Sequence, residues 1–178
     1  NTTANDIALY KKCLNLHKDT TFLHIAHEDA MVATVYQILQ PPNLKYILKI
    51  CTRPNDYLRE IYFLQYFSNI LPMPRIIKTV EPEKNLNGAI LMEYLPGNSP
   101  KTANLTNKLA YEIGVLLAQI HSHSTDGFGD LTQMDNLSQD PSSHFTMKFE
   151  EGLAECKNHL PVSLIEKCRA YYESNLTL

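Results

Sequence analysis

Lys49 and Glu60 are the two residues whose types and spacing most directly suggest chemistry. Lys49 lies near the end of the β-rich run 44–51, and Glu60 lies in the helical segment that follows it. A site that binds phosphate needs a cation, and a nearby carboxylate can hold the flexible lysine stem in place. Taken alone, the two residues are better explained as solvated surface charges, which are the rule in proteins. The residues around them must decide between these two interpretations.

A second candidate is the segment 90–97, in which an apolar strand leads directly into Pro96 and Gly97. The backbone beyond such a strand can bind the edge of a purine, with one carbonyl accepting and one amide donating a hydrogen bond. Side-chain identity matters little for this contact. An ordinary strand end followed by a turn would therefore show the same pattern.

The pattern of apolar, β-branched and turn residues predicts the elements that position these candidates. Strands are expected at 20–26, 32–39, 44–51, 75–80 and 89–94, and helices at 5–17, 53–70, 105–120, 143–159 and 162–174. The Asn87-Gly88 pair predicts a tight hairpin turn between the last two strands. We therefore expect an α+β chain. A five-stranded antiparallel sheet with one helix would occupy 1–95, a linker 96–103, and a helical part 104–178.

Seven short segments occur in an informative order. They are VYQIL (35–39), YILKI (46–50), REIYFLQYF (59–67), PMPRIIKT (72–79), ILMEYLPG (90–97), LAQIHS (117–122) and GFGDL (127–131). Together, over residues 20–131, they resemble the aminoglycoside phosphotransferase family of small-molecule kinases, which includes choline kinase-like members. The resemblance implies a protein-kinase-like fold, in which the N-terminal lobe is followed by the first helices of a partial C-terminal lobe.

The same resemblance implies a role for particular residues. Lys49 would bind the α- and β-phosphates of ATP or GTP, and Glu60 would be its salt-bridge partner. The backbone carbonyl of Glu93 and the backbone amide of Leu95 would bind the base, and Met92 would be the gatekeeper behind it. The other walls of the base pocket would come from Ile25, Val35 and Ile47.

The chain departs from the family pattern in two places. The loop 27–33, expected to lie over the phosphates, contains no glycine, and the first glycine of the chain is Gly88. The family's catalytic loop, a His-Gly-Asp followed five residues later by Asn, is absent, and so is the Asp-x-Asp type of metal motif. We expect residue 178 to precede that loop. No metal ligands are therefore assigned, and Mg²⁺ is expected only with the missing part of the C-terminal lobe.

Two functions stay open. In the first, the chain is the ATP- or GTP-binding part of a kinase that phosphorylates a hydroxyl group of a small molecule. By itself it would be inactive, because the metal site and the aligned nucleophile are missing. In the second, it is a non-catalytic kinase-like module that senses nucleotide or binds a partner. If the chain is truly truncated at Leu178, uncovered apolar helix faces would favour self-association.

Composition and charge exclude several other classes of protein. The 178 residues are 44% hydrophobic and 20% charged, as in ordinary globular proteins. The net charge of −3 argues against a nucleic-acid partner. No run approaches the roughly 20 apolar residues that a membrane span needs, so we expect no membrane partner. The cysteines, at 13, 51, 156 and 168, form no CxxC pair and are expected to be reduced, mostly buried thiols of a cytoplasmic protein.

Overall fold

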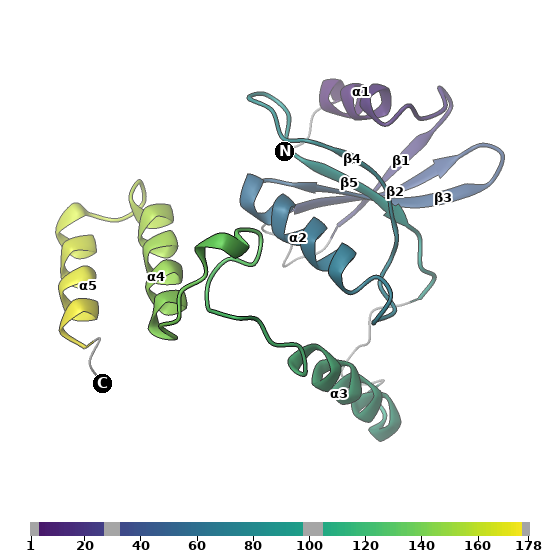
Figure 1. Ribbon diagram of the computed structural model, residues 1–178. Coiled ribbons are helices and arrows are strands. Elements are labelled where there is room, and N and C mark those ends of the chain that lie inside the picture. Colours follow the sequence, from purple (N-terminus) through teal and green to yellow (C-terminus); the bar gives the residue numbers. More distant parts are fainter. Residues whose placement is uncertain (1–3, 27–32, 98–104, 176–178) are drawn as a thin grey trace. The chain divides into compact units, whose positions relative to one another are not determined.

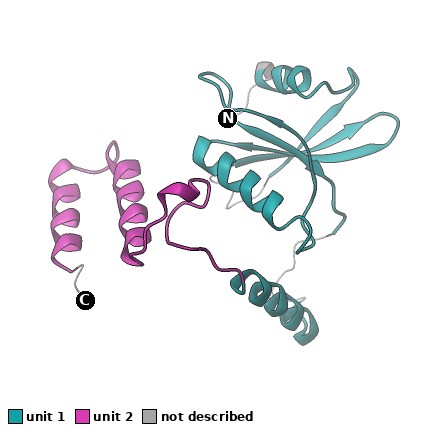
Figure 2. Ribbon diagram, in the orientation of Figure 1, with its two compact units in different colours: residues 1–122 teal, residues 123–178 magenta. Residues whose placement is uncertain are grey.

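The computed structural model describes residues 4–26, 33–97 and 105–175. Its internal contacts divide the chain into two compact units, residues 1–122 and residues 123–178 (Figure 2). None of the helices within the described ranges combines the length and the apolar character needed to cross a lipid bilayer.

The first unit is built on a five-stranded antiparallel sheet with the strand order β1-β2-β3-β5-β4 (Figure 1). The strands are β1 (Thr21–Ile25), β2 (Ala33–Gln40), β3 (Leu44–Cys51), β4 (Ile76–Val80) and β5 (Ala89–Glu93). Their β-branched, aromatic and leucine side chains suit the half-buried surface of a sheet. β3 is the central strand, so its side chains have register neighbours on both sides.

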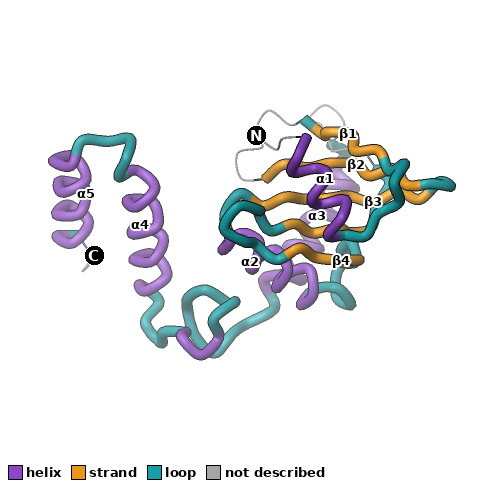
Figure 3. The backbone as a smooth tube through the Cα atoms, turned by 90° about the horizontal axis from the view of Figure 1, so that it is seen from above, coloured by secondary structure: helices purple, strands orange, loops and turns teal. Residues whose placement is uncertain are grey.

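Two helices of this unit, α1 (Ala4–Cys13) and α2 (Pro54–Tyr66), cover opposite faces of the sheet (Figure 3). Tyr10 and Leu14, in and just after α1, belong to one core cluster, and Tyr57 and Leu64 of α2 belong to the other. Alternate residues of a strand face opposite sides. On β3, Leu48 and Ile50 therefore face α1, whereas Ile47, Lys49 and Cys51 face α2.

The connection between β4 and β5 differs from the turn predicted from Asn87-Gly88. The chain turns between Glu83 and Leu86, which form an isolated β-bridge, and Gly88 lacks the positive φ that the predicted turn requires. A Cβ atom at position 88 would lie 2.6 Å from the nearest carbons of the Tyr57 ring. The glycine is thus needed for a close approach between backbone and ring, and not for the turn.

The helix predicted from the apolar stripe at 105–120 forms as α3 (Asn107–His121). The Thr106 hydroxyl caps its first turn by accepting a hydrogen bond from the Leu109 amide at 3.2 Å. None of the α3 residues is buried, and Leu117 is 49% exposed. The stripe is therefore present but uncovered within the part of the chain that the structure describes.

The second unit contains a short 3-10 helix (Met134–Asn136) and two longer helices, α4 (Ser142–Cys156) and α5 (Val162–Ser174). The Phe149 ring stacks on Tyr172 with centroids 4.0 Å apart. The hydroxyls of Thr146 and Tyr172 lie 2.9 Å apart, and Arg169 pairs with Glu150. These contacts hold α4 and α5 together, although neither helix has a buried residue.

The prediction of mostly buried thiols is wrong. All four cysteines are free, but only Cys51 is buried, while Cys13 is exposed and Cys156 and Cys168 are partly exposed. Cys51 lies on the α2-facing side of the central strand, which explains its burial. Cys13 and Cys156 are the last residues of α1 and α4.

Candidate functional site

An ion pair joins the central strand to the helix that covers it. The Lys49 Nζ atom lies 2.8 Å from the Glu60 Oε2 atom, and the two side chains are 27% and 33% exposed. The pair forms because Lys49 faces α2 and Glu60 lies between Tyr57 and Leu64, the two buried residues of α2. A solvent-accessible pair of this kind contributes only about 0–1 kcal/mol to stability. The Lys49 side chain is therefore only partly covered.

A cavity of about 220 Å³ lies beside this pair. Its described lining includes three basic side chains and two carboxylates, together with Ala33, Cys51 and Phe63; the charged residues are Lys49, Arg53, Arg59, Asp56 and Glu60. Arg53 Nε lies 2.6 Å from Asp56 Oδ2. The described part of the lining has a net positive charge, which suits an anion. Whole-ligand pockets are typically about 300–1,000 Å³, so this cavity is smaller than a typical whole-ligand pocket.

Cys51 adds no charge to this cavity. Burial raises the pKa of its thiol from 9.0 to about 11, although the nearby Lys49 opposes the shift. The thiol is therefore neutral at physiological pH and presents a small apolar surface.

An apolar row adjoins the charged end of the site. Ile25 pairs with Val35 across β1 and β2, and Val35 pairs with Lys49 across β2 and β3. Ile47 pairs with Met92 across β3 and β5. Register partners in antiparallel strands share a face, so these residues all lie on the α2 side of the sheet. Ile25 is 43% exposed, whereas Met92 is buried.

Arg75, which was not predicted as a site residue, holds the last residue of β5, Glu93. The Arg75 side chain donates to both Glu93 carboxylate oxygens, at 3.2 and 3.4 Å. The Glu93 amide donates to the Arg75 carbonyl at 2.9 Å. Hydrogen bonds from Arg75 lower the pKa of the Glu93 carboxyl. Glu93 is the register partner of Tyr46, so its side chain leaves the sheet on the face opposite Met92.

Most of the predicted site residues lie on one face of the sheet. The structure brings Lys49 and Glu60 into contact and places the four apolar candidates of the strands on that face. Leu95 follows β5 and is 49% exposed. The loop 27–33 lies outside the described residues except for Ala33. Three arginines at 53, 59 and 75 were not predicted, although the Arg53–Asp56 spacing of one helical turn is a signal that could have been used.

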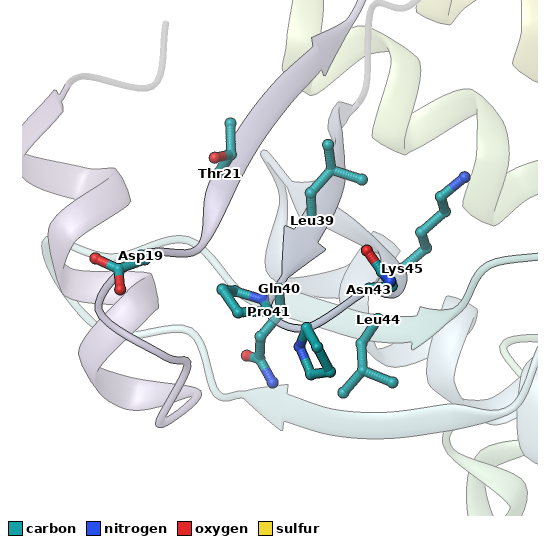
Figure 4. A pocket seen from close by; sticks show the side chains of 9 residues that line it. Asp19, Thr21, Leu39, Gln40, Pro41, Asn43, Leu44 and Lys45 are labelled. Atoms are coloured by element: carbon teal, nitrogen blue, oxygen red, sulfur yellow. The ribbon is translucent and has the colours of Figure 1, made fainter.

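A larger hollow of about 540 Å³ lies at the outer end of the β2–β3 hairpin (Figure 4). It is lined by Asp19, Thr21, Leu39, Gln40, Pro41, Pro42, Asn43, Leu44 and Lys45. One acid and one base leave the described lining with no net charge. This hollow is therefore less suited to a polyphosphate than the cavity beside Lys49.

No group of three or more His, Cys, Asp or Glu side chains in the described ranges could hold a metal ion. The Mg²⁺ that accompanies nucleotides needs an octahedral set of oxygen ligands. The described residues do not supply that set.

The five-stranded antiparallel sheet, the helix between its β3 and β4 strands and the lysine–glutamate pair that joins them define a protein-kinase-like α+β fold. The model of the APH phosphotransferase enzyme family matches residues 27–164, which is more than half of the chain. The chain belongs to this phosphotransferase family.

Two solved structures are similar to this chain. A complex of gentamicin with APH(2″)-IIa aligns with a TM-score of 0.58 at 17% identity, over 99% of this chain and 58% of that one. A ternary complex of streptomycin, ATP and APH(2″)-IIa aligns with a TM-score of 0.54 at 17% identity, over 97% and 58%. This chain thus spans less than two thirds of the length of these structures. No curated protein matches the sequence significantly.

Proposed function

We propose that this chain is the nucleotide-binding part of a small-molecule phosphotransferase that moves the γ-phosphate of ATP or GTP to a substrate hydroxyl. The main support is the 2.8 Å pair between Lys49 and Glu60, beside a positively lined cavity. An apolar row on the same face of the sheet adjoins that cavity. A charged end and an apolar end on one surface match the two ends of a nucleotide.

Each part of the site has a distinct task in this proposal. Lys49 binds the α- and β-phosphates, and Glu60 restricts the lysine stem so that less side-chain entropy is lost on binding. The base lies against Ile25, Val35 and Ile47, with Met92 behind it. The backbone of Glu93 and Leu95 provides the acceptor and donor for the edge of the base.

The chain is proposed to bind nucleotide without transferring phosphate on its own. The His-Gly-Asp and Asn groups that orient the acceptor hydroxyl in this family do not occur in the 178 residues. Positioning and charge neutralisation supply most of the rate in phosphoryl transfer. We expect no acceptor-dependent ADP formation in a coupled assay, and Lys49-dependent turnover would contradict this.

The charge of the second unit favours a cationic acceptor. Residues 123–178 contain nine acidic and four basic side chains, a net charge of −5. Gentamicin is bound in one of the two solved neighbours, and streptomycin is bound together with ATP in the other. We propose a positively charged, hydroxyl-bearing small molecule as the acceptor. Calorimetry with these two compounds at low and high salt tests this, since electrostatic binding weakens as salt rises. A module that only senses nucleotide would bind neither compound.

Self-association is also proposed, because the α3 stripe is uncovered in the described chain and exposed apolar patches promote association. Light scattering across a range of protein concentrations measures it, and a monomer at all concentrations would contradict it.

Thermal unfolding with ATP, GTP and their Mg²⁺ complexes tests nucleotide binding. Ligand at about 100 times its dissociation constant adds about 2.7 kcal/mol, a Tm rise of roughly 5–10 °C. Lys49→Ala should lose most of this rise. Lys148→Ala is the matched control, because Lys148 forms a similar 2.9 Å pair with Glu151 on α4. A nucleotide-dependent rise that Lys49→Ala leaves intact would overturn the proposed site.

A further inference from the structure

Two buried tyrosines reach the β4–β5 connection from opposite faces of the sheet. Tyr10 of α1 donates its hydroxyl hydrogen bond to the Asn87 carbonyl at 2.9 Å. Tyr57 of α2 donates to Glu81 Oε1, also at 2.9 Å. Both side chains are almost fully buried, at 2% and 0% exposed. Only the second tyrosine lies on the helix that bears Glu60.

We infer that Tyr57 is a positioning residue for the Lys49–Glu60 pair. It acts through the hydrogen bond of its hydroxyl to Glu81 and through the packing of its ring on the Gly88 backbone. This inference rests on the proposed function, because it concerns how the phosphate-binding lysine is held. It assigns to the Tyr57–Glu81 hydrogen bond a role in nucleotide affinity in addition to its role in stability.

The geometry of α2 couples Tyr57 to Glu60. Residues three apart lie on the same face of a helix, and Tyr57 precedes Glu60 by three positions. Tyr57 and Leu64 are the only buried residues of α2. Tyr57 is therefore the buried contact nearest to the N-terminal end of the helix, and a rotation of that end would move the Glu60 carboxylate away from Lys49.

Gly88 contacts both the Tyr57 ring and the strand that bears Lys49. A Cβ atom at position 88 would lie 2.6 Å from the Tyr57 Cγ and Cδ2 atoms, so the ring rests directly on this backbone. The Gly88 carbonyl accepts a hydrogen bond from the Cys51 amide at 2.9 Å. Cys51 follows Lys49 by two residues on β3. Helix α2, through Tyr57, and strand β3, through Cys51, thus both contact the backbone of Gly88.

The hydrogen bond is maintained at physiological pH. Burial, and then the contact with Glu81, raise the pKa of the Tyr57 phenol from 10.0 to about 12. The phenol therefore stays protonated and donates to the Glu81 carboxylate, a charge-assisted bond of the stronger type.

Tyr57→Phe and its matched control Tyr10→Phe test the inference. Each substitution keeps the ring and removes one 2.9 Å hydrogen bond, and Tyr57→Phe also removes the hydrogen bond between the phenol and Thr79. Binding of ATP, inorganic tripolyphosphate and adenosine is measured by calorimetry on the folded chain. We expect Tyr57→Phe to weaken ATP and tripolyphosphate binding by about threefold to tenfold, typical of coupling through a packed element. Adenosine binding should stay unchanged, and Tyr10→Phe should change none of the three affinities.

Measuring the effect of Tyr57→Phe on ATP affinity in a Glu60→Gln protein separates positioning from a general structural effect. If Tyr57 acts through Glu60, Tyr57→Phe should have no further effect on affinity once the Glu60 charge is gone. An equal loss in both backgrounds would overturn the inference, because it would show an effect independent of the ion pair.

Glu81 provides a second route if Tyr57→Phe fails to fold. Glu81 is exposed, so its substitution is tolerated more easily. Glu81→Ala should reproduce the affinity loss, while Glu81→Gln, which keeps an acceptor oxygen, should restore most of it. If these variants bind nucleotide as tightly as the unsubstituted chain, this inference is overturned but the proposed function is not. Absence of ATP and tripolyphosphate binding by the unsubstituted chain would overturn the proposed function and this inference with it.

Discussion

Val35 and Lys49 are register partners in the β2–β3 ladder, and their side chains leave the sheet on the same face. This pairing places an apolar wall beside the lysine that contacts Glu60. A slip of one residue in the register would send the two side chains to opposite faces. The position of an apolar row beside the cation proposed to bind phosphate is therefore a consequence of strand pairing.

Gly88→Ala tests whether the close approach to the Tyr57 ring is required for stability. The new methyl group would lie 2.6 Å from ring carbons, so the ring or the backbone must shift. Overpacking of this kind costs about 1–3 kcal/mol. We expect a lower urea midpoint with an unchanged slope of free energy against denaturant.

Gly114→Ala is the control for that substitution. Gly114 lies within α3, and a Cβ atom added there would meet open space. Alanine in a helix interior is favoured over glycine by about 0.5–1 kcal/mol. The two Gly→Ala substitutions should therefore change stability in opposite directions. A Gly88→Ala chain as stable as the unsubstituted protein would show that the ring is not tightly seated.

Alkaline pH should destabilise the fold through the buried tyrosines. Burial raises the pKa of both Tyr10 and Tyr57 from 10.0 to about 12 in the folded chain. The folded state thus holds these protons more tightly than the unfolded state does. The associated stability is complete below pH 10 and is lost as the pH rises toward 12. We expect the free energy of unfolding to fall over this range, and less steeply in Tyr57→Phe and Tyr10→Phe.

Urea unfolding at several pH values between about 9 and 11.5 measures this dependence. Cys51 also makes the free energy of unfolding fall as the pH rises. Its effect begins at a lower pH, because its thiol pKa rises from 9.0 to about 11. A slope that neither Tyr→Phe substitution reduces would contradict the assignment to these two phenols.

Arg75→Ala should weaken recognition of the base but not of the phosphates. The Arg75 side chain and carbonyl both contact Glu93, whose backbone carbonyl is proposed to bind the edge of the base. We expect a severalfold loss of adenosine and ATP affinity, with tripolyphosphate binding unchanged. Arg169→Ala, which breaks a comparable pair with Glu150 on α4, is the control. An equal loss for tripolyphosphate would indicate a general defect in folding.

Much of this architecture could be predicted from local sequence. The strand at 44–51 and the helix at 162–174 form with the predicted bounds, because their β-branched and amphipathic patterns are clear. The α+β kinase-like fold is confirmed. The period of two along β3 is also what puts Ile47 and Cys51 on the same face as Lys49.

Contacts between residues distant in the sequence could not be predicted in this way. The Tyr57–Glu81 bond joins residues 24 positions apart, and the Arg75–Glu93 contact joins residues 18 positions apart. Neither spacing leaves a periodic signal in one sequence. The role of Gly88 was missed for a related reason, since Asn-Gly has a strong local meaning and the ring it contacts belongs to another element.

Methyl NMR of the chain during ATP titration tests the central claim most directly. If the nucleotide binds the α2 side of the sheet, the methyl signals of Ile25, Val35 and Ile47 should shift. Those of Ile38 and Ile50, which belong to the core on the α1 side, should not. Shifts confined to Ile38 and Ile50, shifts confined to the β2–β3 hollow around Leu39 and Leu44, or no shifts at saturating ATP would contradict the proposed site.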